Sequence, residues 1–405
     1  MPIEKAPYIR YTEETSVVDY GTPNAEIPVF IAPSKVNVTS GSTTTYQDVS
    51  IDKNHIYLIN SFKEAESLFK EASATTDTEL LKQLRQYFEE NSYYYGDEYG
   101  SPYVYVIPLP TTATTTGEGS DAVTTQHPTG TDFTNAIELV AMKKETQVIA
   151  IIGINDIASI KTELATELSL ESQDGFLRIA YIQAPALNTN ETYTEYASRI
   201  ATLNESINNT RICLVEPEFF GYHLAKISNT PYYVEPGYLP FYSVELGVFK
   251  ELTKDERDKL CMSGLIFGED DYTLSEPVPR ICLGTSSAFG RSSRTDYGTR
   301  VVDALLHARR NVDHQVREIY KIVAPQLKRN ETSVILRYVQ DEVMSYLDTE
   351  LTNGTLMQYE FSIEESSFNP YCLLVKGKIV PVNSTLAIEF KNTIGAPYSI
   401  ASDYV

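Results

Sequence analysis

The five histidines are the side chains in this sequence best suited to proton transfer or metal binding. They are His55, His127, His223, His307 and His314. His307 and His314 are seven residues apart, which places both on one face of a helix. No further histidine or cysteine stands at ligand spacing from them, so a packed or solvated pair is the favoured interpretation. The sequence predicts no metal site and no cofactor.

Two carboxylates stand where an α/β enzyme would carry its active site. Asp156 and Glu216 each follow a strand-like apolar run, and such sites lie at the carboxyl ends of parallel strands. A helix cap is the favoured interpretation of Asp156. The motifs GxSxG, GxGxxG and GxxxxGKS/T do not occur, and no nucleophile has a credible base. We therefore expect no enzymatic activity, with an α/β hydrolase-like enzyme as the alternative.

The four cysteines are widely separated and form no CxxC pair. They are Cys213, Cys261, Cys282 and Cys372. Neither a zinc site nor a disulfide framework is predicted from this spacing. Three of them lie in apolar, strand-like runs, where a cysteine acts as a small hydrophobic side chain.

One region is basic within an acidic chain. Residues 300–340 carry eight basic and four acidic side chains, a local charge of +4 in a chain of net charge −22. Arg310, Arg317 and Lys321 share one face of the helix predicted there, and an ordinary solvated helix face is the competing interpretation. The net charge argues against partners such as nucleic acid or an anionic membrane.

The last hundred residues are predicted to form two amphipathic helices and a small sheet. Apolar residues recur three and four apart over 302–323 and 335–347, as on the buried face of a helix. Pro325 ends the first helix, and Asn353-Gly354 ends the second. Alternating apolar residues then predict three strands, over 357–363, 373–379 and 386–390.

The preceding residues alternate between strand and helix. Strand-like runs occur over 26–32, 55–60, 103–108, 148–152, 175–182 and 211–215. Single helices between strands are typical of a parallel sheet covered by helices. The Thr-rich residues 111–131 are interpreted as an exposed loop. The predicted fold class is α/β and α+β, a central helix-covered mixed or parallel sheet followed by a C-terminal domain of two helices and a small antiparallel sheet.

We divide the chain into four parts by these patterns. They are an N-terminal arm (1–22), a central α/β region (23–285), a C-terminal domain (286–393) and a C-terminal arm (394–405). No apolar run is long enough to span a bilayer, and Met1-Pro-Ile-Glu-Lys5 does not begin a signal peptide. We expect synthesis in a cytoplasm, no direct membrane insertion, and retention there or release by lysis.

The sequence predicts extended arms at both ends. A small sheet with an open edge, together with extended termini, indicates chains that add strands to each other's sheets; frayed or self-packed termini are the alternative. The candidate pairing residues are Tyr8, Ile9, Tyr11, Val17, Val18, Tyr398, Ile400 and Tyr404. Each arm joins the rest of the chain through a glycine and a proline, which we interpret as hinges. These are Gly21, Pro23, Gly395 and Pro397.

The order of the elements resembles that of the contractile tail sheath proteins of phages and related injection machines, over nearly the whole chain. Pro28-Val-Phe-Ile-Ala32 is similar to their first core strand. Asn60 to Phe69, Leu81 to Phe88 and Tyr103 to Ile107 are similar to the helix, helix and strand that follow. Tyr87-Phe88-Glu-Glu-Asn-Ser92 departs from the usual Phe-Phe-Asn-Gly-Gly.

Later segments carry the same resemblance. Leu252-Thr-x-x-Glu256-x-x-x-Leu260-x-x-x-Gly264 matches a recurrent helix of that family, and residues 300–323 are similar to the helix that opens its shared C-terminal domain. Gly377-x-Ile379-x-Pro381 stands where sheath proteins carry a similar strand. The order and spacing of these segments carry the resemblance, because each motif alone is unspecific.

The resemblance implies a structural subunit of a bacteriophage tail or a contractile injection system. Such subunits form stacked hexameric rings around an inner tube through exchanged terminal strands, and contract to drive the tube through a target envelope. The implied partners are further copies of the chain, the inner tail tube protein, and baseplate and tail terminator proteins. The basic helix face would then contact the tube. A static filament or surface-layer protein is the alternative.

Overall fold

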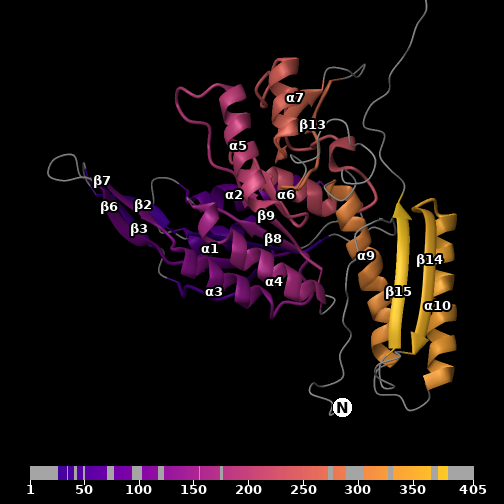
Figure 1. Ribbon diagram of the computed structural model, residues 1–405. Helices are drawn as coiled ribbons and strands as arrows, with labels where there is room; N and C mark the ends of the chain where they lie inside the picture. Colours follow the sequence, from indigo (N-terminus) through magenta and orange to yellow (C-terminus); the bar gives the residue numbers. More distant parts are fainter. Residues whose placement is uncertain are drawn as a thin grey trace, which may run out of the picture.

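The computed structural model describes residues 26–33, 35–40, 43–48, 51–70, 77–93, 103–116, 123–154, 156–173, 177–271, 277–288, 305–326, 332–365 and 373–381. Figure 1 shows a central unit built on a twisted sheet and a smaller C-terminal unit beside it, with a long helix, α9, passing from one to the other. Among the described residues, no helix combines the length and apolar content that a membrane crossing requires.

A seven-stranded sheet forms the middle of the central unit. Its strand order is β11-β10-β9-β8-β1-β5-β4. The bounds are β1 Pro28–Pro33, β4 Tyr57–Ile59, β5 Val104–Leu109, β8 Val148–Ile151, β9 Ile179–Gln183, β10 Ile212–Val215 and β11 Leu265–Ile266. Every neighbouring pair is parallel except β4 and β5, which are antiparallel. The predicted mixed sheet is thus confirmed, with its antiparallel strand at one edge.

The inner strands are buried on both faces, which explains their continuous apolar sequences. In β1, Phe30 and Ala32 pack on one face, while Val29 and Ile31 pack on the other. Three helices cover the first face: α1 (Phe62–Phe69), α2 (Glu79–Asn91) and α6 (Phe220–Asn229). Four cover the second: α3 (Gly130–Val140), α4 (Lys161–Gln173), α5 (Tyr193–Ile207) and α7 (Lys254–Met262). Two short 3₁₀ turns, η2 (Ile157–Ser159) and η3 (Pro236–Tyr238), lie in the connections.

Side-chain caps begin several of these helices. Ser61 accepts a hydrogen bond from the amide of Glu64, and Thr253 forms a capping box with Glu256. Asp132 is the third helical residue of α3. Thr129 is the N-cap there, and Asp132 closes its capping box.

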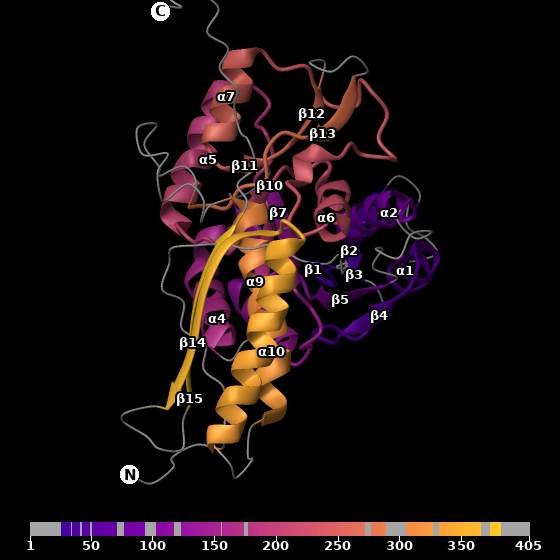
Figure 2. The same ribbon diagram turned by 90° about the vertical axis from the view of Figure 1, so that its right-hand side faces the viewer.

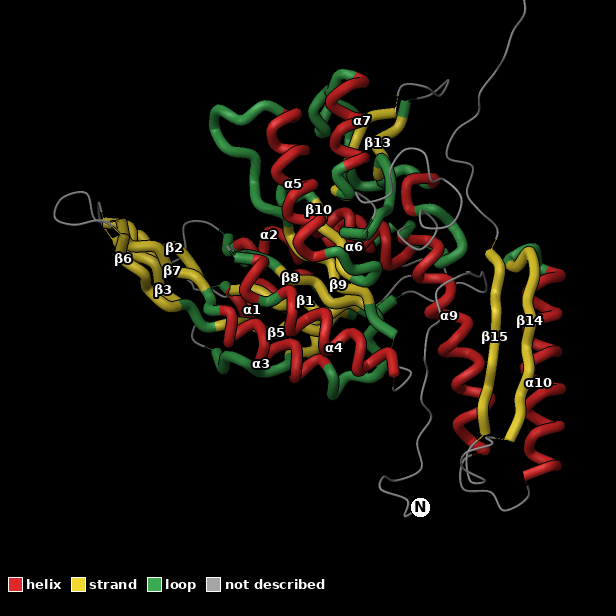
Figure 3. The backbone as a smooth tube through the Cα atoms, in the orientation of Figure 1, coloured by secondary structure: helices red, strands yellow, loops and turns green. Residues whose placement is uncertain are grey.

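Two hairpins extend together from the sheet (Figures 1 and 3). The first pairs β2 (Lys35–Ser40) with β3 (Thr43–Asp48), and the second pairs β6 (Thr112–Thr116) with β7 (Val123–His127). They leave the carboxyl ends of β1 and β5, which are neighbouring parallel strands. The interpretation of residues 111–131 as a loop is therefore wrong for β6 and β7, because a run of threonine also suits a two-stranded ribbon.

The C-terminal unit is a two-stranded sheet on two helices, as Figure 2 shows from the side. Its elements are α9 (Leu306–Val323), η5 (Ala324–Gln326), α10 (Thr332–Thr352), β14 (Leu356–Glu365) and β15 (Leu373–Pro381). Helix α9 ends just before Pro325, and Gly354 adopts a φ of 74° after α10, so both predicted stops are confirmed. The third predicted strand, 386–390, lies outside the described residues.

An irregularity in β14 changes which of its residues face the helices. The pairing with β15 shifts between Leu356 and Gln358, so Leu356 is 3% exposed and Met357 is 60% exposed. A bulge of this kind adds one residue to the strand and breaks its alternation. The prediction that Met357 shares the buried face of Tyr359, Phe361 and Ile363 is therefore wrong.

Candidate assembly site

The carboxyl edge of the central sheet is occupied by structural hydrogen bonds. Glu216, directly after β10, accepts from the amide of Gly268 at 2.8 Å and contacts Nε2 of the fully buried His223 at 2.6 Å. Beside it, the Gln183 side chain bridges the amide of Gly153 and the carboxylate of Glu79. These contacts fasten neighbouring strand ends together, so the geometry favours a packing role for Glu216 over a catalytic one.

Asp156 does not cap a helix through its side chain. It precedes η2 in an exposed position, and no side-chain cap hydrogen bond is formed there. Its backbone carbonyl accepts from the Ser159 hydroxyl at 2.7 Å. The predicted side-chain cap is therefore wrong, because the turn is closed by a serine reaching back to the backbone.

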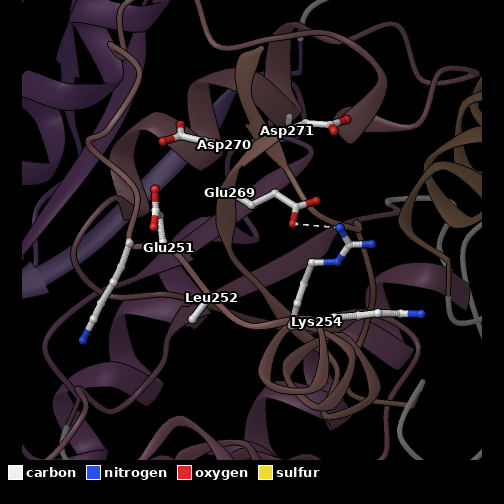
Figure 4. Close-up of a pocket in the computed structure, with 8 residues that line it drawn as sticks. Glu251, Leu252, Lys254, Glu269, Asp270 and Asp271 are labelled. Atoms are coloured by element: carbon white, nitrogen blue, oxygen red, sulfur yellow. Dashed lines mark ion pairs between the residues drawn. The ribbon is translucent and has the colours of Figure 1, made fainter. Parts of the chain in front are cut away.

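A charged pocket of about 330 Å³ lies between α7 and β12 (Gly268–Asp271), as Figure 4 shows. Its lining residues are Lys250, Glu251, Leu252, Lys254, Arg257, Glu269, Asp270 and Asp271. Arg257 pairs with Glu269 at 3.5 Å, and burial raises the pKa of that carboxyl. The lining contains no histidine, serine or cysteine, so the pocket does not join a nucleophile to a base. Within the described residues, no three histidine, cysteine or acidic side chains are grouped as a metal site.

The two histidines of α9 are packed separately. His307 Nδ1 lies 2.6 Å from Oε2 of Glu235. His314 stacks on Tyr232 with ring centroids 3.9 Å apart. Burial, with the nearby charges of Arg317 and Lys321, lowers the pKa of His314 to about 3. Of the two interpretations left open, packed or solvated, these contacts favour packed side chains.

The first half of α9 is buried against the central unit although most of its residues are polar. Arg310 Nε donates to Glu26 at 2.9 Å, and its Nη2 donates to the carbonyl of Thr230 at 2.7 Å. Arg211 and Asp313 form a second buried ion pair, with Nη2 2.8 Å from Oδ1. Both pairs join α9 to residues at the ends of the central strands. The helix is therefore fixed to the central unit by directional contacts rather than by apolar packing alone.

These contacts overturn part of the predicted basic surface. The side chain of Arg310 is 0% exposed, so the prediction that it faces a partner is wrong. Arg317 is 19% exposed and donates to the carbonyl of Leu177 at 3.1 Å. Only Lys321 of the three is largely exposed, at 65%, and Glu318 pairs with it. The helix face therefore carries one solvent-facing positive charge rather than three.

The second half of α9 belongs to the C-terminal unit. Val323 packs with Val339, Val343 and Leu347 of α10 and with Ile379 of β15. Gln315 also donates to the buried Glu350 of α10 at 3.3 Å, and burial raises the pKa of Glu350. One continuous helix thus carries the packing of both units.

The small sheet has an apolar face on the helices and a polar outer face. Lys378 pairs across the strands with Glu360 at 3.5 Å, and Lys376 pairs with Glu364. Within the described residues, β14 and β15 pair only with each other. Among these residues neither outer edge has a partner strand, and a further strand can add to an edge of that kind. This open-edged sheet is the candidate assembly site.

The predicted arms and hinges fall outside the described residues. This applies to every pairing residue proposed in 1–22 and 394–405, and to Gly21, Pro23, Gly395 and Pro397. Sequence reasoning also missed three residues that contact α9, namely Glu26, Arg211 and Glu235. Their contacts with α9 span 284, 102 and 72 residues of sequence, so no local spacing signals them.

The fold is that of a contractile sheath protein. The chain superposes on a chain of the anti-feeding prophage (AFP) baseplate cryo-EM structure with a TM-score of 0.62 and 13% identity, covering 97% of this chain and 100% of that one. A chain of the AFP helical sheath in its contracted state gives a TM-score of 0.59 and 13% identity, with 96% and 99% covered. The resemblance inferred from the sequence is thus confirmed at the level of the fold.

Sequence comparisons are less informative. A family model described as DUF2586, N-terminal domain, matches residues 31–230, which include most of the central sheet. A search of curated proteins found no match.

Proposed function

We propose that this chain is a structural, non-enzymatic subunit of a contractile sheath. The observation that carries the proposal is the likeness of fold to the AFP sheath across 96% of this chain, including both units and α9. In this role, copies of the chain form hexameric rings stacked around an inner tube. Contraction of the stack drives the tube through a target envelope. The particle is a phage tail or an injection device assembled in the cytoplasm.

The open edges of β14 and β15 support the proposed linkage between subunits. Residues 1–22 and 394–405 act as arms that add strands to the small sheets of neighbouring copies, with Gly21, Pro23, Gly395 and Pro397 as hinges. Main-chain hydrogen bonds supply the affinity in this mode of recognition, so few specific side chains are needed. Baseplate, inner-tube and terminator proteins complete the list of partners.

A second role follows from the match to the AFP baseplate structure. A subunit specialised for the baseplate closes into a ring that does not stack further. Electron microscopy of the purified chain separates the two roles: striated tubes support the sheath subunit, and single rings support the baseplate subunit. Tubes that never change length would support the alternative role, a static filament or surface-layer protein.

The arm assignment is tested by changing the backbone of one arm. Deleting either 1–22 or 394–405 is expected to leave a folded monomer that forms no tubes, because the lost hydrogen bonds lie between subunits. Ile400→Pro should do the same by removing one backbone donor, whereas the matched control Ile400→Val keeps that donor and should assemble normally. Normal tubes from both deletions would refute strand exchange.

A further inference from the structure

Two cysteines that are distant in sequence meet beside the charged pocket. Cys261 lies in the last turn of α7, and Cys282 follows β13 (Val278–Ile281). Their sulfur atoms are 2.8 Å apart, and both residues are partly exposed. Cys213, in contrast, is fully buried in β10. Because 21 residues separate the pair, the sequence spacing gives no sign of it.

The backbone holds both thiols in this arrangement. The amide of Cys282 donates to the carbonyl of Phe267 at 2.9 Å, which ties the end of β13 to the central sheet. The amide of Gly264 donates to the carbonyl of Cys261 at 3.1 Å and closes the turn after α7. A disulfide needs its sulfurs about 2.05 Å apart, so bond formation requires the two sulfur atoms to approach by less than about 1 Å.

The surroundings of the pair set its reactivity. Arg257, which lines the pocket, is close enough to interact electrostatically with both sulfurs and favours the thiolate form of Cys282. The hydrogen bond with Cys261, together with burial, nevertheless raises the pKa of the Cys282 thiol well above its usual range. A thiol with a raised pKa is a slow nucleophile near neutrality. Oxidation of the pair should therefore be slow near neutrality and faster in alkaline solution.

We propose that Cys261 and Cys282 form a redox-responsive dithiol that closes to an intramolecular disulfide under peroxides. The Cys261 thiolate attacks one peroxide oxygen, breaks the O–O bond and becomes a sulfenic acid, with one water released. The Cys282 thiolate then attacks that sulfur and expels a second water after protonation. Two thiols lose two electrons and two protons in total, and one hydrogen peroxide is reduced to two waters.

The bond would join α7 to the segment that leads into α9. Two residues after Cys282, the carbonyl of Gly284 accepts from the amide of Leu306 at 2.9 Å, at the first turn of α9. Oxidation thus links a surface helix of the central unit to the connection with the C-terminal unit. This proposal concerns the isolated chain and stands independently of the proposed assembly.

The test treats the folded, full-length protein with hydrogen peroxide at about pH 8.5, where thiolates are more abundant. After quenching and unfolding, alkylation should count a fall from four free thiols to two per chain. The intact mass should fall by two hydrogen atoms, and one disulfide-linked peptide pair should contain residues 261 and 282. Dithiothreitol should restore all four thiols.

Variants assign the bond to this pair. Cys261→Ala and Cys282→Ala should each abolish the loss of two hydrogen atoms, and Cys282→Ala should leave a sulfenic acid on Cys261 that dimedone captures. The matched control Cys372→Ala should still form the bond. Peptide mapping of the parent protein identifies which cysteines are bonded even if a variant folds poorly. Four thiols surviving peroxide, or a bond through Cys213, Cys372 or a second chain, would overturn the proposal.

Discussion

At the scale of single residues, the ion pair between Glu26 and Arg310 is one of two buried ion pairs described between α9 and the central unit. Breaking a buried pair leaves an uncompensated charge, which typically costs about 3–5 kcal/mol, whereas replacing both partners with apolar residues is often much less harmful. We expect Arg310→Met to lower the free energy of unfolding by about that amount. Combining it with Glu26→Leu should destabilise by less than the two single changes added together. Urea unfolding followed by circular dichroism measures both.

The control for that experiment is a surface arginine. Arg337 of α10 has a side chain that is 88% exposed and lies 4.0 Å from Asp341. An exposed pair of this kind contributes about 0–1 kcal/mol, so Arg337→Met should change stability little. Equal effects of Arg310→Met and Arg337→Met would contradict the buried joint.

We expect His314 to make the free energy of unfolding depend on pH, and the sign of this dependence follows from the surroundings of the ring. Its pKa is lowered to about 3 from a usual value of 6.5, so between these values the unfolded chain binds a proton that the folded chain excludes. Stability contributed by the neutral ring is therefore present above pH 6.5 and is lost as pH falls toward 3. His314→Phe keeps a ring to stack on Tyr232 and should flatten this loss.

The measurement compares unfolding free energies of the parent and His314→Phe between pH 7 and about pH 4. Each unit of pH within the window changes the difference by at most about 1.4 kcal/mol. The neighbouring Glu318, which lies 3.9 Å from the ring, is kept in both proteins. Parallel pH profiles would show that the histidine is not the sensitive group.

At the scale of elements, the bulge in β14 makes a sharp distinction between adjacent residues. Leu356 is buried with α9 and α10, while Met357 faces solvent. Leu356→Ala should cost about 2–5 kcal/mol by leaving a cavity, and Met357→Ala should stay within about 0.5 kcal/mol. Thermal unfolding of the two variants tests the register of β14. A strand without the bulge would bury Met357 and expose Leu356, so Met357→Ala would then be the more destabilising change.

Some features of the fold follow from local sequence patterns, and the bulge in β14 does not. Strands β1, β8 and β10, the Thr253 cap and the ends of α9 and α10 follow from apolar runs, capping residues, Pro325 and Gly354, which are local signals. The bulge does not follow, because one extra residue is invisible until a partner strand fixes the register. The buried half of α9 does not follow either. In the sequence its polar residues have the pattern of a solvated helix face. Their partners Glu26 and Glu235 come from distant segments and are known only from the structure.

At the scale of the whole molecule, α9 makes the central and C-terminal units difficult to move apart. A change of lattice in the proposed sheath must then be absorbed where subunits are joined. We expect Gly21→Val and Gly395→Val together to hinder contraction, because valine restricts the backbone angles that glycine leaves open. Particle length after denaturant treatment, measured by electron microscopy, reports the effect, while monomer unfolding should be nearly unchanged.

Neighbouring positions provide the control for the hinge experiment. Thr22→Val and Thr393→Val place the same side chain beside each glycine without removing it. These particles should shorten as readily as the parent. If the double glycine variant also assembles extended and contracts normally, the hinge assignment is wrong even where the sheath role holds.

The pair between Glu26 and Arg310 also sets the earliest time at which a newly made chain can complete this contact. The two residues are 284 positions apart, so at 5–20 residues per second a ribosome makes the second about 15–60 s after the first. During that interval the carboxylate of Glu26, which precedes β1, lacks its ion-pair partner Arg310. The central sheet therefore cannot reach its final stability while only the first part of the chain has been translated. In the proposed sheath, premature encounters between nascent chains would thereby be limited, because a stable surface for neighbours exists only once nearly the whole polypeptide has emerged.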